Sequence, residues 1–165
     1  STQRLELKQL GASDAPFMLE LLNDPSFIAN IGDRGVRTVE DAARYIQDRM
    51  TPSYARYGYG LYRVELKATG TPIGICGLVR RDYLDDPDVG FAFLPPYRRH
   101  GYANESAAAT KAYALDVLGA ARVLAITAPG NSGSIRVLQK IGLRFERMIA
   151  PPGDMGEIRL YTSYP

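Results

Sequence analysis

The segment from residue 88 to residue 118 constrains the fold more than any other part of this chain. Its residues predict a strand over 88–94, a tight turn through Pro95 and Pro96, and an alanine-rich helix that opens near Gly101. A helix start leaves several backbone N–H groups without intrahelical partners, and the helix dipole adds partial positive charge there. Glycine lacks the Cβ that would keep an anion away from those groups. The segment therefore predicts a cradle for a pyrophosphate.

A plainer interpretation of the same turn is an ordinary strand–helix connection whose arginines, Arg98 and Arg99, are solvated. The context favours the anion site. A strand precedes the turn, a helix of small residues follows it, and a second capped helix begins near Asn131.

Length and charge narrow the class of protein. At 165 residues the chain predicts a single domain over 1–165, large enough to bury a core. A net charge of +2 is too small to favour a nucleic-acid partner through bulk charge. The chain has no run of about 18 apolar residues, so we expect no membrane span.

Two single residues exclude several chemistries. Cys76 is the only cysteine and lies in an apolar run, which indicates core packing and a reducing compartment such as the cytoplasm. His100 is the only histidine, so we expect no multi-histidine metal site, and no metal is predicted. A Ser-His-Asp triad is excluded unless the cradle itself supplies the base.

The remaining elements follow from periodicity and turn signals. Strands are predicted over 4–10, 57–67, 72–81, 121–128, 143–149 and 157–164, and helices over 13–23, 38–50 and 131–142, with 27–37 irregular. A strand–helix–strand crossover is right-handed, so the strands at 88 and 121 should be parallel.

Three stretches resemble the GNAT superfamily of acyl-CoA N-acyltransferases, in the RimJ/RimL-like branch that contains the ribosomal-protein alanine N-acetyltransferases. Arg98-Arg-His-Gly-Tyr-Ala matches the family's Q/R-x-x-G-x-G/A cradle. The segment 131–143 matches the branch's N-x-x-S-x-x-v-l-x-K-x-G-F pattern, and Arg4-Leu with Asp14 and Asn23-Asp-Pro matches its opening. The resemblance implies an α+β fold: a mixed, mostly antiparallel sheet of about seven strands with flanking helices and a splayed parallel strand pair at the cofactor site.

The resemblance also implies acetyl-CoA as acyl donor. Its pyrophosphate is expected on the backbone N–H groups of 99–104, and its pantetheine arm beside the strand that carries Phe91 and Phe93. The expected cofactor-binding residues are Phe91, Phe93, Leu94, Arg98, Arg99, His100, Gly101, Tyr102, Ala103, Asn104 and Asn131.

The expected reaction is direct attack of a primary amine on the thioester in a ternary complex. Many superfamily members place a tyrosine where this chain has Leu138, so we expect Ser134 to protonate the leaving sulfur, unless it only caps its helix. Tyr161 is a further candidate acid. Asp88, Asp82 and Glu105 are candidate bases acting through water, with a surface or ion-pair role as the alternative for each.

The acceptor is expected to be a protein N-terminal α-amine or a small-molecule amine. Neutralising a lysine-like amine near pKa 10.4 costs about 3 kcal/mol more than an α-amine near 8. Candidate substrate-binding residues are Asn30, Arg34, Arg37 and Tyr83, although solvated arginines are the alternative. The chain is expected to act as a monomer or homodimer. A non-catalytic acyl-CoA-binding sensor is the alternative function.

Overall fold

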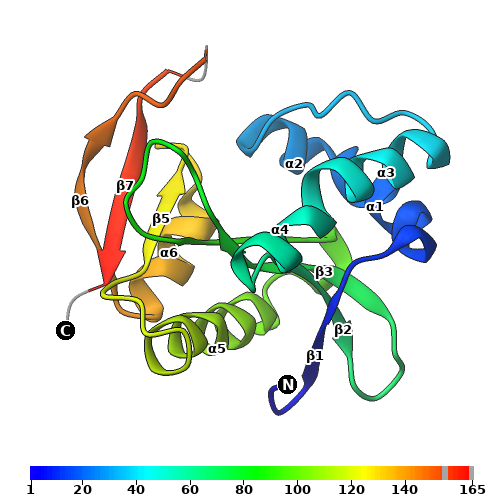
Figure 1. Ribbon diagram of the computed structural model, residues 1–165, viewed down its shortest axis with the longest axis horizontal. Coiled ribbons are helices and arrows are strands. Elements are labelled where there is room, and N and C mark those ends of the chain that lie inside the picture. Colours follow the sequence, from blue (N-terminus) through cyan, green and yellow to red (C-terminus); the bar gives the residue numbers. More distant parts are fainter. Residues whose placement is uncertain (154–155, 164–165) are drawn as a thin grey trace.

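Seven strands form one sheet that runs through the molecule (Figure 1). The computed structural model describes residues 1–153 and 156–163. The strands lie in the order β1-β2-β3-β4-β5-β7-β6. Their bounds are Leu5–Gln9 (β1), Leu61–Leu66 (β2), Pro72–Val79 (β3), Asp88–Phe93 (β4), Leu124–Thr127 (β5), Leu143–Ile149 (β6) and Ile158–Ser163 (β7).

All neighbouring strands are antiparallel except β4 and β5, which are parallel as the crossover rule predicts. The connection between β4 and β5 contains the long helix α5, Tyr102–Asp116. The predicted α+β class with a seven-stranded mixed sheet is therefore confirmed.

Helices cover both faces of the sheet, because successive side chains of a strand point to opposite faces. Cys76 of β3 packs in a core with Ala107 and Ala114 of α5, and Leu138 of helix α6 (Ser132–Lys140) joins it. Ile75, the next residue to Cys76, packs instead against the helices that precede β2. Those are α1 (Ala15–Leu22), α2 (Pro25–Asn30), α3 (Val39–Tyr45), a π-helical turn (Ile46–Met50) and α4 (Thr51–Tyr57).

The helices between β1 and β2, residues 15–57, form what we call the helical lobe. Two predictions were wrong in this lobe. Residues 27–37, expected to be irregular, begin within α2, because Asp24 caps that helix and Pro25 occupies its first turn. Asp24-Pro25 follows the end of one helix and begins the next. The sequence analysis predicted only the end of the first helix. Residues 57–60, expected to be strand, instead end α4 at Gly58, whose φ of 75° terminates the helix.

Helix α4 was not predicted, because the helix that begins at Thr38 was expected to end near residue 50. The remaining elements lie where the sequence predicted them, within a few residues at each end. Gly101 is the N-cap of α5, Thr38 closes a capping box on α3, and Asn131 caps α6. Two predicted positions, Asp154 in the last turn and Tyr164 at the last strand's end, lie outside the described residues.

Candidate active site

The sheet opens between β4 and β5. These strands pair at a single register position, Asp88 with Leu124, and do not pair farther along. The backbone N–H of Leu94 donates to the carbonyl of Ile73 on β3, at 2.9 Å. Successive N–H groups of a strand point to opposite edges, so those of Phe93 and Phe91 face the gap. The β4 side of the gap therefore presents the backbone N–H groups of Phe91 and Phe93.

A turn of unusual backbone shape follows β4 and leads into α5. Arg99 has φ of 64° and Gly101 has φ of 81°, both in the left-handed region. Among the described residues, the backbone N–H groups of 99–104 have no hydrogen-bond acceptor, whereas that of Glu105 donates to the carbonyl of Gly101 at 3.0 Å. This turn, which we call the cradle (residues 99–104), presents unpaired amides at the positive end of a helix.

The segment that precedes β1 braces the cradle from outside the cavity. The Arg4 side chain donates through Nε to Glu105 at 2.8 Å and through Nη1 to the carbonyl of His100 at 3.1 Å. Its guanidinium also lies 4.5 Å from the centre of the Tyr102 ring. Burial raises the pKa of the Glu105 carboxyl, but hydrogen bonds from Thr2 and Arg4 outweigh burial and lower it. Glu105 is therefore an anchoring anion and does not face the cavity as a base.

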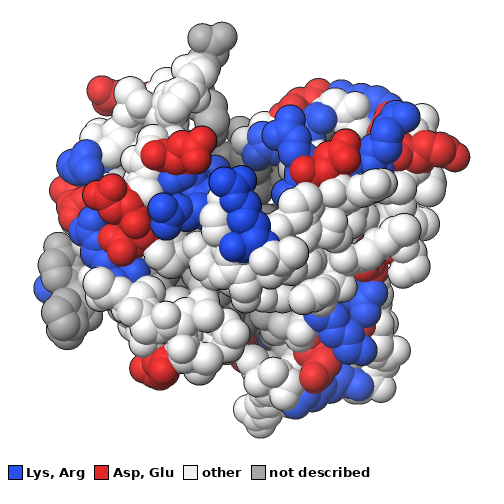
Figure 2. Space-filling view, in the orientation of Figure 1, with Lys and Arg blue, Asp and Glu red and all other residues white. Residues whose placement is uncertain are grey.

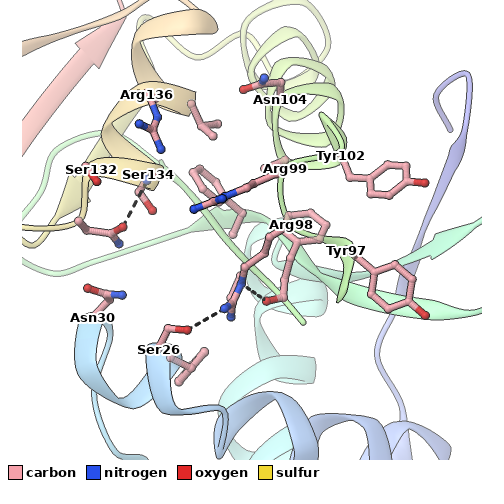
Figure 3. Close-up of a pocket in the computed structure, with 18 of the residues that line it drawn as sticks. Ser26, Asn30, Tyr97, Arg98, Arg99, Tyr102, Asn104, Ser132, Ser134 and Arg136 are labelled. Atoms are coloured by element: carbon pink, nitrogen blue, oxygen red, sulfur yellow. Dashed lines mark hydrogen bonds between the residues drawn. The ribbon is translucent and has the colours of Figure 1, made fainter. Parts of the chain in front are cut away.

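The side chain of Arg98 turns away from the cradle and ties it to α2 (Figure 3). It donates to the carbonyl of Phe93 at 3.0 Å, to Ser26 Oγ at 2.7 Å and to Asp24 Oδ2 at 2.6 Å. We call this set of contacts the Arg98 clamp. It holds together the end of β4, the cradle and the first turn of α2.

Two cavities meet at the gap. A donor cavity of about 520 Å³ lies beside the cradle and α6, and an acceptor cavity of about 430 Å³ lies between α2 and the β3–β4 edge. They share a common wall, formed by Phe27, Asn30, Ile31, Phe91, Ala92, Asn131 and Ser134. The two spaces are thus parts of one cleft that passes the open edge of β4.

Most predicted cofactor-binding residues line the donor cavity. They are Phe91, Phe93, Arg98, Arg99, Gly101, Tyr102, Ala103, Asn104 and Asn131. His100 is exposed and stacks on Tyr102, and Leu94 is buried in the helical lobe; neither lines the cavity. The backbone N–H of Ser134 donates the helix-capping bond to Asn131 Oδ1, at 3.3 Å.

The predicted catalytic residues separate into two groups. Ser134 lines both cavities, and within the described part of the chain its hydroxyl has no hydrogen-bond partner. Tyr161 is 1% exposed, packs its ring against Phe145 and lines neither cavity. Its place on β7, between β5 and β6, points it into the core and away from both cavities.

Asp88 lines the acceptor cavity at the point where β4 meets β5. It is 1% exposed and accepts from Arg81 Nε at 2.5 Å. Burial raises the pKa of the Asp88 carboxyl, and the Arg81 guanidinium lowers it by a smaller amount, so the net shift is upward. Asp82, the other acidic candidate, is exposed and lines neither cavity.

The predicted substrate-binding residues are also divided. Asn30 and Arg34 line the acceptor cavity. Arg37 does not, because its guanidinium pairs with Asp33 at 2.5 Å and with Asn23 at 3.0 Å. Tyr83 is exposed on the β3–β4 loop and lines neither cavity.

Sequence reasoning missed several residues of the cleft. Arg136 and Lys140, four residues apart on α6, line the donor cavity, and Arg81 lines the acceptor cavity. The i,i+4 spacing of Arg136 and Lys140 after a helix cap was a usable signal. Nothing local connects Arg81 to Asp88, because only the β3–β4 hairpin brings them together.

The donor cavity suits the diphosphate of an acyl-CoA. The cradle supplies unpaired amides, Gly101 gives the turn its left-handed backbone, and Arg99, Arg136 and Lys140 add three cations to the lining. Within residues 1–153 and 156–163, no group of three His, Cys, Asp or Glu side chains is placed to hold a metal ion. In the same part of the chain, no helix has the length and apolar character to cross a bilayer.

Comparisons with known proteins agree with this geometry. Residues 4–144 match the acetyltransferase (GNAT) domain. A Bacillus subtilis (strain 168) protein described as the uncharacterized N-acetyltransferase YnaD is 28% identical over 148 residues, covering 88% of this chain and 82% of that protein. A GNAT-family acetyltransferase structure from Bacillus anthracis has a TM-score of 0.80 at 25% identity, covering 98% and 95% of the two chains. A RimL α-N-protein acetyltransferase in complex with coenzyme A has the same fold, with a TM-score of 0.83 at 16% identity over 98% and 94% of the chains. This chain therefore belongs to the GNAT acetyltransferase family and is an acyltransferase.

Proposed function

We propose that the protein is an acetyl-CoA-dependent N-acetyltransferase that acts on a primary amine by direct attack in a ternary complex. The observation that carries the proposal is the continuity of the cleft. The unpaired amides of the cradle lie at one end, the open edge of β4 in the middle and a second cavity at the other end. A donor and an acceptor can enter from opposite sides and meet at the gap.

The cradle amides and the side chains of Arg99, Arg136 and Lys140 would hold the diphosphate of acetyl-CoA. When bound, acetyl-CoA supplies an acetyl thioester. The N–H groups of Phe91 and Phe93 face the gap and can pair with amide groups of an extended ligand, as an added strand would. The Phe93 N–H is also the group best placed to stabilise the oxyanion, since it needs no side chain and is fixed by the strand.

Transfer forms a C–N bond, breaks a C–S bond and moves one proton from the amine nitrogen to the sulfur. Ser134 lines both cavities and is the proposed proton donor to the sulfur. A thiol has a pKa of about 8.5, so a weak acid suffices. The Asp88 carboxyl, with its raised pKa, is the proposed acceptor of the amine proton through water.

An amine of low pKa suits a site where, among the described residues, the one lining carboxylate, Asp88, is already ion-paired. A protein N-terminal α-amine meets this requirement better than a lysine side chain. The likeness in fold to RimL, an α-N-protein acetyltransferase, supports the same choice. The cytoplasm stays the predicted compartment, on the strength of the single buried cysteine.

The test is to mix the purified protein with acetyl-CoA and a panel of small amines and short peptides, and to measure the release of free thiol. Calorimetry with CoA, run in parallel, measures occupation of the donor cavity. Thiol release that requires a specific amine supports the enzyme. Tight CoA binding without turnover on any amine would instead identify a non-catalytic acyl-CoA sensor. The observation that favours this alternative is Leu138, which stands where many members of the superfamily have a tyrosine.

A further inference from the structure

The charges that line the acceptor cavity have an unusual balance for a site that receives an amine. Two arginines, Arg34 and Arg81, and one carboxylate, Asp88, give the lining a formal charge of +1. Among the described residues, every charged side chain that lines the donor cavity is a cation. Figure 2 shows basic surface on both sides of the hollow between α2 and the β3–β4 loop.

The carboxylates near the acceptor cavity are already paired. Asp88 binds Arg81, and Asp24, at the start of α2, binds Arg98. Of the acidic side chains of the β3–β4 loop, Asp82 and Asp85 are exposed and Asp86 pairs with Arg122, and none is part of the lining. Among the described residues, therefore, no unpaired carboxylate lines either cavity to receive a second positive charge.

In contrast to these paired carboxylates, the guanidinium of Arg34 has no partner among the described residues. It lines the acceptor cavity from the segment after α2, and no hydrogen bond or ion pair within the described residues engages its guanidinium. Arg37, three residues later, pairs with Asp33, so the contrast lies within one short loop. A guanidinium without a partner at the mouth of a cavity is a ready site for a carboxylate.

The rest of the lining is mainly apolar. Leu22, Phe27, Met50, Ile75, Phe91 and Ile126 form the body of the cavity. An acceptor that fits must place an apolar group against these side chains and its amine near the gap.

We infer that the natural acceptor is a mono-amine with an apolar body and an anionic group, and that Arg34 binds the anion. This inference rests on the proposed acetyltransferase function and adds the substrate class to it. Polyamines and aminoglycosides are excluded as good acceptors, because the second charge of a polycation would meet arginines where it needs a carboxylate. The anionic amine can be a small molecule or a peptide with an acidic residue after its N-terminus.

The test uses matched acceptors whose amines have nearly the same pKa. One pair is 4-(2-aminoethyl)benzoate and its carboxamide; the other is the peptides Phe-Asp-Gly-amide and Phe-Asn-Gly-amide; spermidine is the polycation. We expect the anionic member of one pair to have a kcat/KM about tenfold higher than its neutral partner, because a hydrogen bond to a charged group is at stake. The pair that discriminates identifies the source as small molecule or peptide.

Arg34→Gln should reduce that ratio to near one, and Arg34→Glu should invert it. Arg34 is exposed, so neither variant should lose its fold. Arg44→Gln is the matched control: Arg44 lies on α3, pairs with Asp41 and lines neither cavity, so its ratio should equal that of the wild type.

Equal rates for both members of each pair, a preference for spermidine, or a ratio that Arg34→Gln leaves unchanged would overturn the inference while leaving an acetyltransferase. Absence of turnover with every amine would remove the proposed function itself. In that case, calorimetry of the benzoate and its carboxamide with the CoA-loaded protein still decides: equal affinities, or affinities that Arg34→Gln does not alter, overturn the role of Arg34.

Discussion

The two halves of the cleft are built in different ways. The donor half is made mainly by two continuous stretches, 91–104 and 131–140, and its key groups are the backbone amides of the first. The acceptor half collects side chains from α1, α2, β3, β4, β5 and α6. A backbone site depends on local conformation and tolerates changes in side chain. A side-chain site depends on the whole fold and can change its ligand through single substitutions.

The largest effect should come from distorting the backbone of the cradle. In Gly101→Val a β-branched residue would have to adopt a φ of 81°, which is strained for any residue with a Cβ. The new Cβ would also lie 3.3 Å from the Arg4 guanidinium, closer than an ordinary contact. We expect the Kd for CoA, measured by calorimetry, to rise at least a few hundredfold, because two or more charge-assisted bonds are lost.

Gly119→Val is the matched control. Gly119 has φ of 72° and no atom near its added Cβ, so backbone strain should lower Tm by a similar amount while CoA affinity stays unchanged. Equal loss of affinity in both variants would mean that the Gly101 effect is general strain, and the contrast between the halves would fail.

Ser134→Ala should have the next largest effect, and only on the chemical step. The backbone N–H that donates to Asn131 is retained, so the helix cap survives. We expect kcat to fall about a hundredfold, the low end for general acid catalysis, with little change in KM for either substrate. Ser134→Cys should restore part of the rate. A wild-type kcat in the alanine variant would leave Ser134 as a helix cap alone.

The Arg98 clamp joins the two halves, so Arg98→Gln should disturb both. We expect KM for acetyl-CoA and for the amine each to rise about tenfold, because three hydrogen bonds that position α2 and the cradle are lost. Arg99→Gln, which removes a cavity-lining cation without such contacts, should raise KM for acetyl-CoA alone. Identical steady-state profiles for the two variants would contradict a positioning role for Arg98.

The smallest effect concerns acid stability. Burial raises the pKa of Asp24, but hydrogen bonds from Arg98, Ser26 and the Phe27 N–H lower it further than burial raises it. A carboxylate with a lowered pKa stabilises the fold above its unfolded pKa of about 3.9, and this stabilisation is lost as pH falls through the folded value. Because Arg98 is partly exposed, the contribution should be at most about 1 kcal/mol.

Urea unfolding of wild type and Asp24→Asn measures this contribution. The difference in free energy of unfolding should be largest at pH 7 and should shrink below pH 4. A difference that is constant down to pH 3 would show that charge on Asp24 contributes nothing to holding α2.

The same contrast explains what the sequence could predict. The cradle was predicted because its signals are consecutive: β4, two prolines, Gly101 and the alanines of α5 all report on local backbone shape. The clamp contacts of Arg98 and the burial of Tyr161 were not predicted, because they depend on distant neighbours. Asp24 lies 74 residues from Arg98 in the sequence, and Tyr161 is oriented by its pairing with Ala125 and Phe145. Hydrophobic periodicity predicts which face of an element is buried, but not which polar partners it meets.

The single register pair between Asp88 and Leu124 has a mechanical consequence. The strands β1–β4 and the unit β5–β7 share few main-chain bonds, so an extended molecule that bonds to Phe91 and Phe93 becomes part of the framework linking them. Amide hydrogen exchange along the middle of the sheet should then slow on saturation by far more than exchange at β1 or β6. A ligand bound along β4 would therefore make the middle of the sheet more rigid for as long as it stays bound.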